Sequence, residues 1–326
     1  MAEETEVGSA AKATPTISAV VGAYNAQEWI GETVSAILSQ THPPDEVVVV
    51  DDGSTDGTAA ELERFGSKLR VVRQSNGGCP AAFNRAFAEA RGDYVAMCGA
   101  DDLWEPDKLE RQFAALTAHP QIDLALGGAW NFGTVEGPWT PAPEQGLQDA
   151  RLLMPMLYRR NIVCASSALI RRSLYLRLGP FVESAEGERF ACDDYDYWLR
   201  ALASGAVLYY DPNVLVKYRW HATNATRAQL WVHRSRLRTH RWHADNVADP
   251  QIVREVLADD LSQIARAEIE EGDYDRARAS FTESLRQRVT PRAMLFALIL
   301  RLSERHARRL IEGLVAAKRS RARASS

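Results

Sequence analysis

The sequence predicts an α/β fold in which helices flank a mostly parallel sheet. Residues 47–50 are four consecutive valines, and an apolar run without polar alternation is typical of a strand covered on both faces. Residues 29–38 place apolar side chains along one face of a helix that follows an earlier apolar run. Alternation of such strands and helices favours a parallel sheet.

The first predicted strand, residues 17–25, ends in Tyr24 and Asn25 and precedes that helix. The second strand ends in Asp52 and Gly53, where glycine allows a tight turn before the next helix. In open α/β sheets, ligands bind at the carboxyl ends of the strands. Both strand ends therefore supply polar groups at the expected ligand-binding edge.

A third strand over residues 69–72 leads into Asn76 and two glycines, and a helix follows. A fourth strand, residues 93–98, ends shortly before Asp101 and Asp102. If these strands share one parallel sheet, the polar groups after strands one, two and four converge on one edge.

Composition indicates a cytoplasmic enzyme. A chain of 326 residues can bury a substantial core, and a net charge of −4 provides no basic field for nucleic acid. Residues 1–14 lack the apolar and basic regions of a signal peptide, so a disordered tail is expected there. The four cysteines are scattered, which favours reduced packing thiols over a zinc cluster or disulfides.

A series of short motifs resembles the family 2 glycosyltransferases, which have a GT-A fold. The motifs are Ala23-Tyr24-Asn25, Asp51-Asp52-Gly53-Ser54, Asn76-Gly77-Gly78, Ala100-Asp101-Asp102, Trp104-Glu105-Pro106-Asp107-Lys108-Leu109-Glu110, Gly179-Pro180-Phe181, Asp193-Asp194-Tyr195-Asp196-Tyr197-Trp198-Leu199-Arg200 and Tyr218-Arg219-Trp220-His221.

The resemblance covers residues 15–226 and implies a GT-A domain there. Its nucleotide-binding half would be residues 15–105 and its acceptor half residues 106–226, followed by a helical extension over residues 227–326. The resemblance implies inverting transfer of a sugar from a nucleoside diphosphate donor, with UDP favoured, to a saccharide, lipid-linked or other hydroxyl acceptor. Bacterial cell-surface polysaccharide or glycolipid synthesis, at the inner face of the cell membrane, is the expected setting.

A divalent cation is expected at the second acidic motif. Loss of a diphosphate develops negative charge, which a cation held by oxygen ligands stabilises. The resemblance implies Mn2+ or Mg2+ on Asp102, with Asp101 near the ribose or the water shell of the metal. His221 is placed near the metal or the diphosphate, and the guanidinium of Arg219 suits bidentate phosphate contacts. The alternatives are a helix cap for Asp102 and a packing role for His221.

The resemblance assigns the nucleotide to the first strand ends. Asp52 would contact the nucleobase or ribose, Tyr24 would pack against the base, and Asn76 would line the same pocket, with Asn25 and Gly53 in the adjoining turns. A carboxylate accepts an imide or hydroxyl hydrogen, and a tyrosine ring offers a flat apolar surface. Turn formation and packing at the edge of the core are the alternatives.

The acidic motif over residues 193–200 is expected to supply the base. Helical spacing puts Asp194, Tyr197 and Trp198 on one side. The resemblance implies that Asp194 takes the proton of the acceptor hydroxyl and that Asp193, Tyr197 and Trp198 bind the acceptor. A pocket walled by the two aromatic rings would raise the pKa of Asp194 toward neutral pH. Carboxylates that favour a helix start are the alternative reading.

Two departures from the family pattern motivate a second hypothesis. Gly99 stands where a family-typical aspartate is usual, and Phe83 stands where an arginine is usual. A nucleotide-sugar-binding protein without transfer activity is therefore the alternative. A nicotinamide-dependent oxidoreductase is disfavoured because the turn after the first strand lacks the clustered glycines of a pyrophosphate site.

Beyond about residue 227 the resemblance fades. Residues 230–243 are aromatic and basic, which suits either an anionic lipid-linked acceptor or a solvated linking helix. Residues 261–286 predict a helix pair with a Gly-Asp-Tyr corner, and residues 294–300 are seven apolar residues, too few to span a bilayer. Peripheral membrane binding or a homodimer contact through these helices is the hypothesis.

Overall fold

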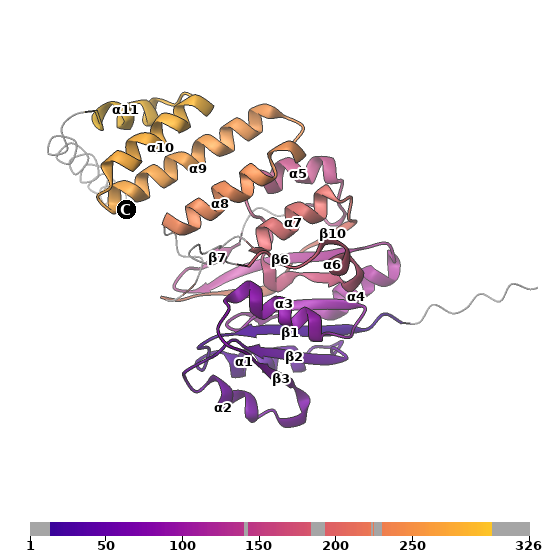
Figure 1. Ribbon diagram of the computed structural model, residues 1–326. Coiled ribbons are helices and arrows are strands. Elements are labelled where there is room, and N and C mark those ends of the chain that lie inside the picture. The colour runs from indigo at the N-terminus through magenta and orange to yellow at the C-terminus, as the bar shows by residue number, and fades with distance from the viewer. Residues whose placement is uncertain (1–13, 140–142, 184–192, 223, 225–229, 302–326) are drawn as a thin grey trace, which may run out of the picture.

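The computed structural model describes residues 14–139, 143–183, 193–222, 224 and 230–301. Within them, ten strands form one sheet, eight of them in the order β3-β2-β1-β4-β9-β6-β10-β5, while β7 pairs with β6 and β8 with β10 (Figure 1). The strands are β1 (Ile17–Ala23), β2 (Glu46–Asp51), β3 (Arg70–Arg73), β4 (Tyr94–Gly99), β5 (Leu103–Trp104), β6 (Leu124–Gly133), β7 (Gly137–Pro138), β8 (Gly146–Leu147), β9 (Leu169–Arg171) and β10 (Leu208–Trp220).

Helices cover both faces of this sheet and extend beyond it. The helices of the first two-thirds of the chain are α1 (Ile30–Leu38), α2 (Thr58–Glu63), α3 (Cys79–Glu89), α4 (Lys108–Ala118), α5 (Ala150–Arg159), α6 (Arg172–Leu178) and α7 (Asp193–Ala203). The C-terminal helices are α8 (Leu230–Trp242), α9 (Pro250–Glu270), α10 (Tyr274–Gln287) and α11 (Pro291–Ile299).

The valine run forms the centre of two hydrophobic cores. Val48 and Val50 face one core, which α3, α5, α6 and α7 complete, whereas Val47 and Val49 face the other, which includes α1 and α4. All four side chains are buried. Because successive strand residues point to opposite faces, a strand covered on both sides has no position for a polar residue.

The carboxyl ends of the first strands lie side by side, as the sequence predicts. Strand β1 pairs in parallel with β2 and with β4, and β2 pairs in parallel with β3. Ala23 is opposite Asp51, and Gly22 is opposite Gly99. The loops that carry the predicted nucleotide and metal residues therefore start from adjacent positions.

The second half of the sheet is mixed. Strand β9 runs antiparallel to both β4 and β6, while the long strands β6 and β10 pair in parallel. The segment over residues 127–161, for which the sequence predicts no elements, contributes most of β6, the short strands β7 and β8, and α5. This arrangement is the GT-A form of the α/β fold.

The C-terminal helices stack beyond α5 and α7, at the opposite end of the molecule from β2 and β3 (Figure 1). Val247 and Val256 pack in the same core as α5 and α7, whereas α10 and α11 share a separate cluster around Phe281. Gly272 has a φ of +83° between α9 and α10, so the predicted helix pair and its corner are confirmed. The domain boundary at residue 227 stays a prediction. The core that contains α5 and α7 extends past this position to Val247 and Val256.

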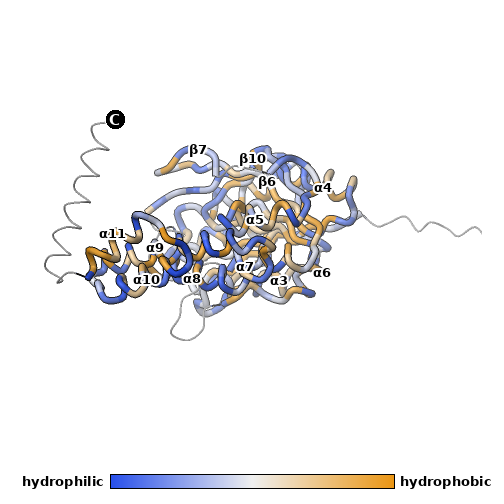
Figure 2. Tube along the Cα trace, turned by 90° about the horizontal axis from the view of Figure 1, so that it is seen from above, coloured by the Kyte–Doolittle hydropathy of each residue, from blue (hydrophilic) through white to orange (hydrophobic). Residues whose placement is uncertain are grey.

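Helix α11 lies at the far end of the C-terminal extension (Figure 2). It has apolar side chains on its surface. Met294, Leu295 and Leu298 are exposed there. No helix in the described part of the chain is long and apolar enough to cross a membrane. Residues 1–13 of the predicted N-terminal tail, residues 1–14, and residues 302–326 at the C-terminus lie outside the described residues.

Helix α4 begins with a buried lysine. Lys108 has no exposed surface, and its Nζ donates to Gln112 Oε1 at 2.8 Å and lies 4.1 Å from the ring centroid of Trp104. No carboxylate of the described residues forms an ion pair with it. Desolvation lowers the pKa of Lys108 to about 7.

We therefore expect Lys108 to make stability depend on pH. Between its folded pKa of about 7 and its higher unfolded pKa, the unfolded chain binds the extra proton, so the free energy of unfolding rises as pH rises. Urea denaturation of the wild type and of Lys108→Met at pH 7 and pH 9 checks this. The wild type should gain about 2 kcal/mol relative to the variant over that interval. A difference that does not change with pH would contradict the assignment.

Candidate active site

Asp52, at the end of β2, organises the loop before α3. Its Oδ1 accepts hydrogen bonds from Gln74 Nε2 at 2.8 Å and from the Gly77 N–H at 2.9 Å, and its Oδ2 accepts from the Gly78 N–H at 2.8 Å. The side chain is buried. Three donors satisfy a buried carboxylate, so Asp52 fixes the position of the glycines and of the α3 N-terminus.

Asn25 joins the loops after β1 and β2. Its φ of +48° lies in the left-handed region, which asparagine tolerates better than most residues. Its N–H donates to Ser54 Oγ at 3.0 Å, and its Oδ1 accepts from the Thr55 N–H at 2.8 Å. Beside it, the ring of Tyr24 is half exposed, and Asn76 is exposed. These side chains leave an aromatic face and an amide open to solvent at this edge.

Asp102 links the end of β4 to two distant segments. Its Oδ2 accepts a hydrogen bond from Ser166 Oγ, and its Oδ1 accepts from the Arg219 N–H at 3.0 Å. The side chain is buried. Burial, and then the neighbouring charge of Asp101, raise the pKa of Asp102 to about 8.

Ser166 begins a segment, residues 166–172, that is also part of the resemblance, but the sequence assigns this serine no role at the site. Besides donating to Asp102, its Oγ accepts a hydrogen bond from the Gly99 N–H at 2.9 Å. A Cβ atom at Gly99 would lie 3.0 Å from Asp101 Oδ1 and 3.1 Å from Asp102 Oδ2. The glycine at this position therefore leaves room for the two carboxylates that follow it.

Asp101 and His221 face each other from β4 and β10. Asp101 Oδ2 lies 2.8 Å from His221 Nε2, and the imidazole stacks on the indole of Trp29 with 4.1 Å between centroids. Both side chains are partly exposed. The structure therefore places His221, expected near the metal or the diphosphate, against Asp101, expected near the ribose or the water shell of the metal.

Arg219 is held by protein groups. Its Nε donates to the Asp101 carbonyl at 2.8 Å, its Nη2 pairs with Glu32 Oε2 at 2.6 Å, and its guanidinium lies 4.4 Å from the Phe132 ring centroid. These contacts fix the arginine beside the acidic motif. Its predicted contact with a diphosphate stays a prediction.

The donor set suits a divalent cation in part. An aspartate oxygen and an imidazole nitrogen are ligands that Mn2+ accepts, and Asp101 and His221 present them at a partly exposed position. Asp102 is behind them, with both oxygens already accepting hydrogen bonds. Among the residues described here, no cluster of three or more His, Cys, Asp or Glu side chains has metal-binding geometry. Two ligands are thus prearranged, and phosphate oxygens of a donor would have to complete the shell.

Asp194 lies in the first turn of α7. Its Oδ1 accepts from the Tyr195 N–H at 2.7 Å, and its Oδ2 accepts from Asn161 Nδ2 at 3.3 Å. Burial raises the pKa of Asp194 above its ordinary range, and burial together with Asp194 raises the pKa of Asp193 to about 8. Sequence reasoning also missed Asn161, whose amide favours the charged form of Asp194.

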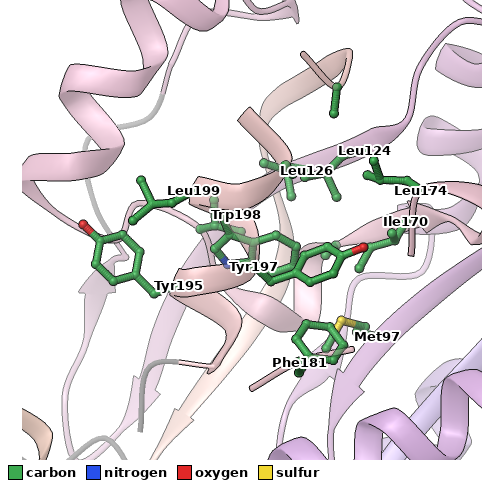
Figure 3. Close-up of a cluster of buried hydrophobic side chains, with 14 of the residues drawn as sticks. Met97, Leu124, Leu126, Ile170, Leu174, Phe181, Tyr195, Tyr197, Trp198 and Leu199 are labelled. Carbon is green, nitrogen blue, oxygen red and sulfur yellow. The ribbon is translucent and has the colours of Figure 1, made fainter. Parts of the chain in front are cut away.

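Tyr197 and Trp198 are fully buried in the core cluster shown in Figure 3, together with Phe181 and Met97. Their rings leave no surface for an acceptor, so the geometry does not support the contact expected of them. Helical spacing correctly groups the two rings, but their side of α7 faces the sheet. Asp193 is the partly exposed member of the predicted acceptor set.

The acids of both halves surround the N-terminus of α3. Cys79, the first residue of α3, is exposed, yet many protein atoms lie around it. Desolvation, followed by the charges of Asp193, Asp194, Asp101 and Asp52 in that order, raises the pKa of its thiol well above the ordinary value. The acids that follow the strands and the acids of α7 therefore all lie close enough to Cys79 to raise the pKa of its thiol.

Comparison with known proteins is consistent with this arrangement. Residues 18–179 match the model of the family described as Glycosyl transferase family 2. An uncharacterized glycosyltransferase of Rickettsia typhi is 28% identical over 222 residues, which are 67% of this chain and 68% of that protein. A putative teichuronic acid biosynthesis glycosyltransferase, TuaG of Bacillus subtilis, is 41% identical over 102 residues, 30% of this chain and 40% of that protein. The chain spans only 35% of a similar Rickettsia felis protein.

Solved structures share the fold. S. aureus TarS 1-349, crystallised in complex with UDP-GlcNAc, has a TM-score of 0.63 at 18% identity over 90% of this chain and 88% of that one. The mannosyltransferase PcManGT from Pyrobaculum calidifontis, in complex with GDP-Man and Mn2+, has a TM-score of 0.53 at 21% identity, covering 94% and 87%.

Replacing Asp52 should destabilise the protein because three donors lose their acceptor. We expect Asp52→Ala to lower the free energy of unfolding by about 2 kcal/mol or more. Asp107→Ala is the matched control, since Asp107 makes no side-chain cap hydrogen bond and pairs with Arg111 only at 3.8 Å. The control should change stability by less than about 0.5 kcal/mol. Equal losses in urea denaturation would contradict the anchoring role of Asp52.

Proposed function

The chain belongs to glycosyl transferase family 2, and we propose that it transfers a sugar, with inversion, from a nucleoside diphosphate donor to a hydroxyl acceptor. The observation that carries the proposal is that Asp102 and Asp194 hydrogen-bond to Ser166 and Asn161 of one short segment, while Asp52 accepts from the N–H groups just before α3. One site thus contains acids suited to the donor side and acids suited to the acceptor side. TarS, whose structure holds UDP-GlcNAc, supports a UDP-sugar as the favoured donor.

The donor base would lie against Tyr24. The half-exposed ring offers a flat apolar surface, and Asn76 and the backbone at Asn25 and Gly53 supply polar groups beside it. Asp52 is committed to the loop before α3, but its Oδ2 accepts only one of these hydrogen bonds and has a second lone pair that can accept from a base or ribose.

Asp101 and His221 would hold a divalent cation, Mn2+ or Mg2+. The bound cation would neutralise charge on the departing diphosphate. Asp102 stays in the proposal as the buried acid that supports the loop carrying Asp101, held by Ser166 and Arg219. The Mn2+ in the PcManGT structure supports this assignment.

Asp194 would act as the base. As the acceptor oxygen forms its bond to the anomeric carbon, the carboxylate takes the hydroxyl proton, and the bond from that carbon to the diphosphate breaks with its electron pair on the leaving group. Attack from the side opposite the diphosphate inverts the anomeric centre. A raised pKa makes Asp194 a stronger base than an exposed aspartate. Asp193 would contact the acceptor.

The biological setting is part of the same proposal. TuaG is named for teichuronic acid biosynthesis, which supports a role in cell-surface polysaccharide or glycolipid assembly on the cytoplasmic side of the membrane. The exposed apolar side chains Met294, Leu295 and Leu298 give α11 a surface for a membrane or a second copy of the chain. Sedimentation with anionic vesicles and the mass of the chain in solution test these two contacts.

Calorimetry with nucleoside diphosphates tests the donor and metal sites. We expect one nucleotide, UDP, to bind the wild type at least about tenfold more tightly with Mn2+ than without it. Asp101→Asn and His221→Ala should lose that difference while keeping the metal-independent affinity. Asp102→Asn shows whether the buried carboxylate contributes to the metal effect.

The outcomes separate three readings. Absence of nucleotide binding under either condition would refute the proposed activity. Mn2+-dependent tightening that survives both Asp101→Asn and His221→Ala would place the cation elsewhere. Nucleotide-sugar binding without any turnover across a panel of acceptors would favour the alternative, a nucleotide-sugar-binding protein without transfer activity.

Asp194→Asn should lower kcat by about a hundredfold or more and leave UDP affinity unchanged, because only proton removal is lost. In the wild type, kcat/KM should fall as pH drops through the raised pKa of the Asp193 and Asp194 pair. Asn161→Ala removes a hydrogen bond that favours the charged base, so this acid limb should move to higher pH. A limb that stays in place would contradict the role of Asp194 as the base.

A further inference from the structure

Buried polar side chains join α7 to the C-terminal extension. The hydroxyl oxygen of Tyr195 lies 2.8 Å from His240 Nε2 on α8. The same oxygen lies 2.7 Å from the Leu157 carbonyl and 3.0 Å from the Tyr158 carbonyl at the end of α5. Tyr195 directly follows Asp194, so the residue next to the proposed base contacts two other helices.

His240 is itself fixed by α9. Its Nδ1 hydrogen-bonds to Asp260 Oδ2, and Asp260 Oδ1 accepts from Arg236 Nε at 2.7 Å. Both His240 and Asp260 are buried. A carboxylate that holds one ring nitrogen fixes the plane of the imidazole, and the other nitrogen is then aimed at Tyr195.

A second histidine makes a parallel contact. His243 Nε2 lies 2.9 Å from Asp196 Oδ1, and Asp196 Oδ2 accepts from Arg200 Nε at 2.7 Å. Asn246 Nδ2 lies 3.0 Å from His243 Nδ1. The amide N–H donates to Nδ1, so the ring proton is on Nε2 and is donated to Asp196.

These hydrogen bonds fix the rotation and the position of α7, which apolar packing alone would leave adjustable. The rings of Tyr197 and Trp198 hold α7 against the sheet, but rotation or a slide of the helix would keep much of that burial. Hydrogen bonds at Tyr195 and Asp196 are lost on such a movement, because they require donor and acceptor within about 3 Å and nearly in line.

We propose that His240 and His243 are positioning residues, which hold α7 from the C-terminal extension and thereby place Asp194 for proton transfer. Only one part of this inference, the role of Asp194, rests on the proposed function. The contacts themselves do not depend on it. Asn161, which follows α5, donates to Asp194, and Tyr195 contacts the last carbonyls of α5. The end of α5, the start of α7 and the end of α8 therefore form one frame around the proposed base.

Two variants remove these links, and two measurements follow them. Tyr195→Phe deletes the hydroxyl with its contacts to His240 and to the end of α5, and His243→Leu deletes the donor to Asp196. In the full-length protein, we expect faster hydrogen exchange of the α7 amides in both. We also expect kcat for release of UDP from UDP-GlcNAc to fall about tenfold to a hundredfold at unchanged UDP affinity, because a displaced base loses alignment rather than nucleotide contacts. His243→Gln, which keeps an N–H donor, should recover part of kcat.

Ser284→Ala is the matched control. Its hydroxyl is buried and donates to the Ala258 carbonyl at 2.8 Å, within the extension and away from α7. This variant should lose stability but keep kcat and the α7 exchange rates. Exchange of α7 that is unchanged in Tyr195→Phe and His243→Leu would overturn the proposal, as would wild-type kcat in both variants below their melting temperatures.

Failure of the proposed function gives a different result. If Asp194→Asn keeps full turnover, the base assignment fails, and a role for the two histidines in catalysis fails with it. If none of the tested donors is turned over, the exchange experiment decides alone: faster exchange in the two linked variants but not in Ser284→Ala supports the positioning of α7.

Discussion

The buried carboxylate of Asp102 is the interaction on which the rest of the site depends. It accepts from Ser166, before β9, and from the backbone of Arg219, on β10, so one side chain holds β4 against two segments of the second half. A buried acid is tolerated only when its oxygens have hydrogen-bond partners of this kind. Asp52 does the same for the loop before α3. Each acid motif thus contains a buried anchor, and Asp101 and Asn76 are the more exposed neighbours that can meet a ligand.

Local patterns predicted the fold well. The valine run identified β2 because burial on both faces excludes polar residues, and the strand ends converged because parallel strands in register must end together. The glycine corner between α9 and α10 could also be read from the sequence, since Gly272 requires a positive φ that few other residues adopt. These features depend on neighbours within a few positions.

The parts that sequence did not predict depend on distant contacts. Ser166 and Asn161 are ordinary polar residues, and only the folded chain brings them to Asp102 and Asp194, 64 and 33 positions away. Helical spacing grouped Tyr197 with Trp198 but could not tell which face of α7 the sheet covers. The segment over residues 127–161 lacks a clear period because its strands are short or irregular and its helix contains Pro155.

The contacts between α7 and α8 have a consequence for how the protein is made. Tyr195 and Asp196 precede their histidine partners by 45 and 47 residues. During synthesis the strands that carry the proposed nucleotide site emerge first and can pair, whereas α7 lacks these partners until residue 243 has left the ribosome. The two sides of the proposed site are therefore completed at different times, and a ribosome-bound chain that ends before α8 would hold paired strands beside an α7 helix that is still unanchored.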